Sequence, residues 1–184
     1  MSGIKVGYIV GSIRKDSFNR KLAQALSKLA PQDFSFEEIT IADLPLYSQE
    51  LDEAFPESIK KFKAHIQSMD AILFVTPEYN RSIPGVLKNA IDIASRPYGQ
   101  SAWSGKPAAL VGASIGAQGT SLSQQHLRNV LAYLDMPTLN QPEVFVHVKE
   151  GLFDEQGNFG PDHVKFYQNW MGRYVAWVKK HRAS

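Results

Sequence analysis

The chain has 184 residues, of which 43% are hydrophobic and 21% are charged, a balance typical of a globular protein with one sizeable core. Its formal net charge is only +2, and no long run of lysine or arginine occurs, which argues against a nucleic-acid-binding surface. Cysteine is absent, so disulfides, thiolate nucleophiles and cysteine-ligated metals are excluded.

Predicted strands and helices alternate along the chain. Apolar runs predict strands at residues 4–10, 34–41, 71–75, 107–113 and 144–148. Apolar residues at helical spacing predict helices before Pro31, after Pro56, after Pro84, around Leu127 and from Pro161 onwards. The first strand begins almost at once and no apolar run is long enough to cross a membrane, so we expect a cytoplasmic protein without a signal peptide.

This alternation predicts an α/β fold made of right-handed βαβ units. We expect a flavodoxin-like, five-stranded parallel sheet of order 2-1-3-4-5, with helices on both faces. The length fits a single domain over residues 1–184. Such a sheet binds ligands outside the carboxyl ends of its strands, at the switch point between strands 1 and 3.

The connection after the first strand, Gly11–Asn19, is rich in small and polar residues. The helix that follows presents unpaired backbone N–H groups and the positive end of its dipole. Ser12, Ser17 and Asn19 add short polar groups, and Arg14 adds a planar cation suited to phosphate oxygens. The sequence predicts a phosphate-binding loop. The alternative is an ordinary turn capped by Ser17 or Asn19.

Polar connections also follow the third and fourth strands, at residues 76–85 and 114–120. In the first of these, we expect Ser82 to cap the next helix, with Pro84 in its first turn. The three connections should meet at one edge of the sheet, since each leaves the carboxyl end of a strand.

The signatures of other nucleotide sites are missing. The chain has no Gly-x-x-x-x-Gly-Lys-Ser/Thr, which argues against a P-loop, and its first turn lacks Gly-x-Gly-x-x-Gly. Glu37 or Glu38 could serve as a ribose-binding acid, so a dinucleotide site stays as the weaker alternative. One phosphate site with two further loops suits a mononucleotide with a flat ring beside Tyr79. Alternatively, Tyr79 packs within its loop and Glu78 is a solvated carboxylate.

Other chemistries have little support. The five histidines show no His-Glu-x-x-His pattern and no spacing typical of a metal site. Ser114 lacks the Gly-x-Ser-x-Gly surroundings of an α/β-hydrolase nucleophile. The sequence therefore predicts neither a metal centre nor an esterase.

Two motifs, in the correct order, resemble the NAD(P)H-dependent FMN reductase family, and especially its chromate and quinone reductases and the related azoreductases. The resemblance covers nearly the whole chain. The motifs are Gly11-Ser12-x-Arg14-x-x-Ser17-x-Asn19 and Pro77-Glu78-Tyr79-Asn80-x-Ser82-x-Pro84-Gly85-x-Leu87-Lys88-Asn89-Ala90-x-Asp92. The resemblance implies an enzyme that binds FMN and takes electrons from NADPH or NADH.

The resemblance also implies which residues bind FMN. The first loop would hold the phosphate, the second would border the ribityl chain and the isoalloxazine, and the third would close the far side of the ring. The matching positions are Ser12, Arg14, Ser17, Phe18 and Asn19, then Pro77, Glu78, Tyr79 and Asn80, then Ser114 and Gly116. Arg81 would either reach the phosphate of the nicotinamide cofactor or project into solvent.

The implied reaction is a ping-pong reduction of small acceptors such as quinones, flavins, azo compounds or chromate. We expect no catalytic side chain, because FMN itself carries the hydride chemistry. The alternative is a flavin-binding electron carrier or redox-sensing partner protein, although such carriers are usually acidic. The family further implies a homodimer or homotetramer. The loop 98–103 is the candidate for a wall beside a neighbour's flavin, unless it folds onto its own subunit.

Overall fold

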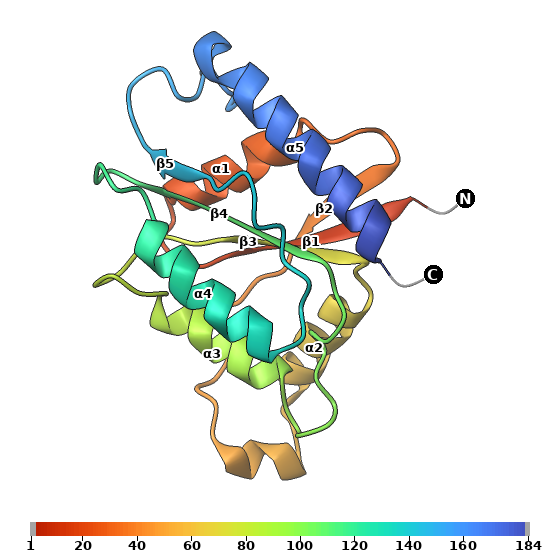
Figure 1. Cartoon of the computed structure of the whole chain (residues 1–184). Helices are drawn as coiled ribbons and strands as arrows, with labels where there is room; N and C mark the ends of the chain where they lie inside the picture. Colours follow the sequence, from red (N-terminus) through yellow and green to blue (C-terminus); the bar gives the residue numbers. More distant parts are fainter. Residues whose placement is uncertain (1–2, 183–184) are drawn as a thin grey trace.

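The computed structural model describes residues 3–182, which form a parallel sheet with helices on both faces (Figure 1). The strand order β2-β1-β3-β4-β5 confirms the predicted flavodoxin-like topology. The strands are β1 (Ile4–Val10), β2 (Phe34–Glu38), β3 (Ala71–Val75), β4 (Ala108–Ser114) and β5 (Phe145–His147). The helices are α1 (Phe18–Ser27), α2 (Glu57–Gln67), α3 (Gly85–Ala94), α4 (Ser121–Tyr133) and α5 (Pro161–His181), with a short 3₁₀ helix at Gln49–Glu53.

The sheet divides the core in two, because successive side chains of a strand point to opposite faces. Val6 and Val10 of β1 pack with α1 and α5, whereas Ile9 packs with α2, α3 and α4. Figure 1 shows these two layers of helices on either side of the sheet. A central strand is thus covered on both faces, which explains the unbroken apolar run of β3.

Two strands are shorter than the sequence predicts. β2 ends at Glu38 rather than at residue 41, yet Ile39 and Ile41 remain buried in the core beside α2. β5 spans only Phe145–His147. Apolar residues predict which positions are buried, not which are paired in the sheet. Ile39 and Ile41 are buried although their backbone no longer belongs to the strand.

Two kinds of feature are absent between residues 3 and 182. No helix in this range has the length and apolar character needed to cross a membrane. No three histidine, aspartate or glutamate side chains in it are grouped so that they could hold a metal ion.

Tyr174 on α5 is fully buried, and its hydroxyl has no hydrogen-bond partner among the described residues. Burial also raises the pKa of this phenol, so the hydroxyl stays neutral. We expect Tyr174→Phe to increase the free energy of unfolding by about 1 kcal/mol, because it removes an unsatisfied buried group. Urea denaturation measures this difference. Phe166→Leu, at an exposed position of the same helix, is the control, and a destabilised Tyr174→Phe would contradict the expectation.

Candidate functional site

The three polar loops follow β1, β3 and β4 and meet at the carboxyl edge of the sheet, as predicted (Figure 1). The Gly11 N–H donates to the Val75 carbonyl at 2.9 Å, which joins the first loop to the end of β3. The chain leaves β1 toward one face of the sheet and β3 toward the other. The loops therefore flank the switch point at which doubly wound sheets bind ligands.

Two serines shape the first loop. Ser17 is the N-cap of α1, and its hydroxyl accepts from the Arg20 N–H at 3.4 Å. The Ser12 hydroxyl accepts from the Arg14 N–H at 3.3 Å. Both side chains are buried, with 6% and 4% of their surface exposed for Ser12 and Ser17, but within residues 3–182 neither hydroxyl donates to an acceptor. Two hydroxyl donors thus remain available to a ligand.

Further donors lie at the start of α1. The N–H groups of Phe18 and Asn19, the first two of the helix, have no acceptor in the described part of the chain, as expected for a helix N-terminus. Arg14 is exposed, and its guanidinium lies 5.9 Å from the centre of the Phe18 ring. Free N–H groups, two hydroxyls and one guanidinium form a donor set that fits the phosphate of FMN.

Asn19 uses its side chain to join α1 to β4. Its amide nitrogen donates to the Ala113 carbonyl, and its amide oxygen accepts from the Ala113 N–H, both at 2.9 Å. The side chain is buried and both of its polar atoms are occupied. The side chain of Asn19 therefore positions the start of the helix, and within residues 3–182 only its backbone N–H is left free for the predicted contact with FMN.

The second loop contains a two-residue hairpin. Tyr79 and Ser82 exchange two backbone hydrogen bonds of 3.0 Å each. Between them, Asn80 and Arg81 have φ angles of 52° and 64°, both in the left-handed region. This is the geometry of a type I′ turn, which Asn tolerates well and Arg adopts at a cost. The hairpin holds Tyr79 and Asn80 at the exposed edge of the site.

Ser82 does not cap α3, and that prediction is wrong. The N-cap of α3 is Pro84, with no side-chain cap. The Ser82 hydroxyl instead lies 3.0 Å from Nδ1 of His126 on α4. The hairpin is the cause, because pairing Ser82 with Tyr79 places its side chain beside α4 rather than at the start of α3.

Glu78 caps α4 from a different loop. One carboxylate oxygen accepts from the N–H groups of Leu122 and Ser123, both at 3.0 Å, and these are the second and third residues of the helix. The N-cap residue Thr120 makes no such bond. The Ser123 hydroxyl in turn donates to the Pro77 carbonyl at 3.0 Å. Glu78 is therefore not a solvated carboxylate, since it fastens the second loop to α4.

We expect Glu78→Ala to lower the free energy of unfolding by about 1–2 kcal/mol, since α4 loses its N-terminal acceptor and a charge that suits its dipole. Glu78→Gln keeps an acceptor oxygen and should lose less. Chemical denaturation of the two variants beside the wild type measures both effects, and Glu50→Ala at an exposed position is the control. Equal stabilities of Glu78→Ala and wild type would contradict the capping role.

The third loop begins at Ser114, the last residue of β4. Its hydroxyl accepts from the Gly116 N–H at 3.1 Å, which shapes the exposed turn that follows. Gly112 makes the approach of the loops possible, because a Cβ there would lie 2.1 Å from the Thr76 carbonyl oxygen and 2.2 Å from the Thr120 hydroxyl. Gly112 was not among the residues predicted for the site. A glycine within an otherwise apolar strand is the signal that indicates such a close approach.

Arg20 is a second residue that sequence analysis missed. Its Nε lies 3.1 Å from a Glu38 carboxylate oxygen, and its Nη1 donates to the Arg14 carbonyl at 3.1 Å. Glu38 is thus the ion-pair partner of Arg20, which weakens the alternative that it binds a ribose in a dinucleotide site. The spacing of the loop did not indicate this contact.

Trp103 of the loop 98–103 folds onto its own subunit, as in the alternative given for this loop, whereas Tyr98 is exposed. Trp103 is fully buried, its Nε1 donates to the Ile91 carbonyl at 2.9 Å, and its ring packs 5.8 Å from that of Phe74. The loop leads into β4, so it lies at the amino edge of the sheet. The reason is topological, since a helix between parallel strands carries the chain back to that edge.

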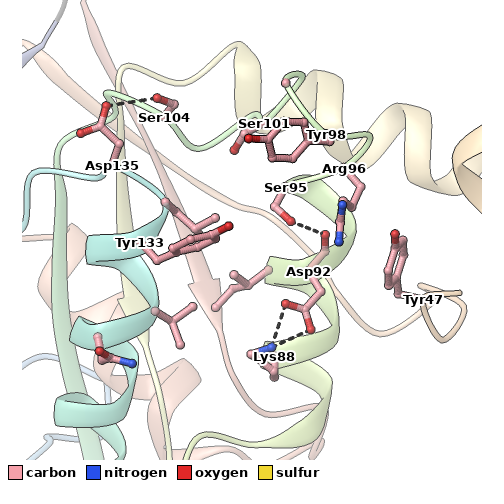
Figure 2. A pocket seen from close by; sticks show the side chains of 15 residues that line it. Tyr47, Lys88, Asp92, Ser95, Arg96, Tyr98, Ser101, Ser104, Tyr133 and Asp135 are labelled. Carbon is pink, nitrogen blue, oxygen red and sulfur yellow. Dashed lines mark hydrogen bonds and ion pairs between the residues drawn. The ribbon is translucent and has the colours of Figure 1, made fainter. Parts of the chain in front are cut away.

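A cleft of about 1030 Å³ lies on a different surface, between α3, α4 and the segment that follows α3 (Figure 2). Lys88 and Asp92 pair within it at 2.8 Å. Tyr98 and Tyr133 are 87% and 85% exposed at its rim. None of the predicted FMN-binding residues lines this cleft, so it is separate from the three loops.

Known proteins resemble this chain over almost its full length. The family model for NADPH-dependent FMN reductase matches residues 4–151, which include all three loops. The chain is 53% identical over 180 residues to a 2-hydroxy-1,4-benzoquinone reductase from a Burkholderia species, covering 97% of this chain and 98% of that protein. It is 49% identical over 179 residues to a quinone reductase from Pseudomonas putida, and the match covers 97% of this chain and 96% of that protein. Among solved structures, the chain resembles FerB from Paracoccus denitrificans, a flavoenzyme NAD(P)H:(acceptor) oxidoreductase, with a TM-score of 0.94 and 41% sequence identity. The match covers 98% of this chain and 100% of FerB.

Proposed function

Because the chain belongs to the NADPH-dependent FMN reductase family, we propose that it is a quinone reductase whose FMN is bound by the three loops. It is an FMN-dependent enzyme that takes electrons from NADPH or NADH. The observation that carries the assignment of the site is the donor set of the first loop. This set consists of the buried hydroxyls of Ser12 and Ser17, the free N–H groups at the start of α1 and the exposed guanidinium of Arg14.

FMN, when bound, accepts a hydride and passes electrons to an acceptor. The chain's own residues bind and orient it: Ser12, Ser17 and Arg14 hold the phosphate, while the backbone of the hairpin borders the ring. Glu78 acts by holding that hairpin against α4. No side chain is proposed as a catalytic acid or base.

The outer rim of the site is open, since Tyr79 and Ile115 are exposed on the second and third loops. An open rim suits a ping-pong reaction in which NAD(P)H and the acceptor occupy the same place in turn. It also suits small acceptors of several kinds, so we include flavins, azo compounds and chromate beside quinones in the proposal.

The test is the purified protein itself. Its visible spectrum should show bound FMN, and it should oxidise NADPH or NADH when benzoquinone is present and no other reductase is added. A ping-pong order predicts parallel double-reciprocal plots when both substrates are varied. A colourless protein that cannot be reconstituted would contradict FMN binding. A protein that holds FMN but shows no turnover would favour the electron-carrier alternative.

We also propose a homodimer or homotetramer that associates through the cleft between α3 and α4. Its rim carries the exposed aromatic residues Tyr98 and Tyr133, and aromatic side chains are enriched in interfaces between protein subunits. Light scattering should show an oligomer for the wild type and a smaller species for Tyr133→Glu. Phe166→Glu, which changes an exposed aromatic residue on α5, should leave the mass unchanged. A monomeric wild type would contradict this proposal.

A further inference from the structure

Arg20 connects three parts of the structure around the first loop. It is the third residue of α1, it pairs with Glu38 at the end of β2, and its Nη1 donates to the carbonyls of Arg14 and Lys15 at 3.1 Å and 3.5 Å. The side chains of Arg20 and Glu38 are 31% and 24% exposed, so the ion pair is partly shielded from water. A planar guanidinium is suited to such a task, because its N–H groups point in several fixed directions.

Few hydrogen bonds other than those from Arg20 hold the middle of the first loop, Gly11–Asn19. Its ends are held by the buried Ser12 and by Ser17, the cap of α1. Within the described residues, the carbonyls of Arg14 and Lys15 accept hydrogen bonds from Arg20 alone. In a trans peptide unit the C=O and the N–H point in opposite directions. Because the two carbonyls point toward Arg20, the N–H groups of the same peptide units, those of Lys15 and Asp16, point away from Arg20. In that direction they can face a ligand.

We propose that Arg20 is a positioning residue for FMN, which holds the phosphate loop in its binding conformation through Glu38 and the two carbonyls. This inference rests on the proposed FMN site. Arg14 of the loop and Arg20 of α1 thus have different tasks. Arg14, which is exposed and has no ion pair within residues 3–182, contacts the phosphate, whereas Arg20 arranges the backbone of the loop. When a site is competent for only a fraction of the time, the apparent affinity falls by that fraction.

FMN release from the holoenzyme tests the proposal. Flavin fluorescence after dilution gives the dissociation rate and, across a dilution series, the dissociation constant. We expect Arg20→Gln to raise the dissociation constant about tenfold, which corresponds to a loop that is competent roughly a tenth of the time. Glu38→Gln should have a similar effect, and the double variant should add little, because the two side chains act as one unit. The dissociation constant of Arg20→Lys should lie between those of the wild type and Arg20→Gln, since lysine keeps the charge but lacks the planar guanidinium with its several N–H donors.

Lys21→Gln is the matched control. It removes the same charge from the next residue of α1, whose side chain is exposed. The dissociation constant of this variant should stay within about twofold of the wild type. If Lys21→Gln weakened FMN binding as much as Arg20→Gln does, the effect would be one of net charge and the positioning role would be overturned.

Limited trypsin digestion gives a readout that a merely structural role would not change. Cleavage after Arg14 or Lys15 should be faster in Arg20→Gln than in the wild type, and added FMN should protect both, while the thermal midpoints stay close. A lower midpoint without faster cleavage in the loop would overturn the proposal. A wild type that binds FMN no better than the variants do would overturn it as well. A wild type that binds no FMN at all would instead refute the proposed function.

Discussion

Replacing Arg14 by alanine should weaken FMN binding by about 1–3 kcal/mol, or roughly 5- to 150-fold. The guanidinium is exposed, lies 5.9 Å from the centre of the Phe18 ring at the start of α1 and has no ion pair within residues 3–182, so in the proposed site its loss removes a charge-assisted contact to the phosphate. Titration of the FMN-depleted protein, followed by flavin fluorescence, measures the change.

Two variants separate the role of Arg14 from the general charge of the loop. Arg14→Lys keeps the charge but not the bidentate geometry, so it should recover only part of the affinity. Lys15→Gln removes an adjacent exposed charge and should change the affinity little. Unchanged FMN affinity in Arg14→Ala would show that this arginine serves another purpose.

Asn19→Ala should lower the free energy of unfolding by about 2–4 kcal/mol. The substitution leaves the buried N–H and C=O of Ala113 without partners, and each unpaired backbone group costs roughly 1–3 kcal/mol. Urea denaturation of the FMN-free protein measures the loss. Gln118→Ala, which removes an exposed amide from the third loop, is the control. A loss below about 1 kcal/mol would mean that water replaces the side chain at Ala113.

The hydrophobic pattern was sufficient to predict the strands of the sheet and the edge at which the three polar loops meet. The apolar run 71–75 is β3 to the residue, because a strand covered on both faces has no polar position along it. The strand order then places the three polar loops at one edge. Patterning failed at the end of β2, since Ile39 and Ile41 are buried without belonging to the strand.

The sequence predicted which loops lie together at the carboxyl edge of the sheet, but it did not predict the partners of their side chains. Glu78 binds the start of α4, 44 residues away, and Asn19 binds β4, 94 residues away. Both were predicted to contact the ligand, yet their side chains serve to hold the loops together. Arg20 was missed because its partner Glu38 belongs to another element, 18 residues along the chain.

The sequence alone thus predicts the fold class, the family and the three loops that we propose to bind FMN, since all of these follow from local periodicity and from motifs within a single connection. Only the tertiary structure decides which polar groups are free to bind a ligand. The hydroxyls of Ser12 and Ser17 keep an unused donor, whereas the Asn19 amide is bonded to Ala113 and a Glu78 carboxylate oxygen is bonded to the start of α4. The physical reason is that a buried backbone N–H must find an acceptor, and packing between distant elements selects the side chain that supplies it.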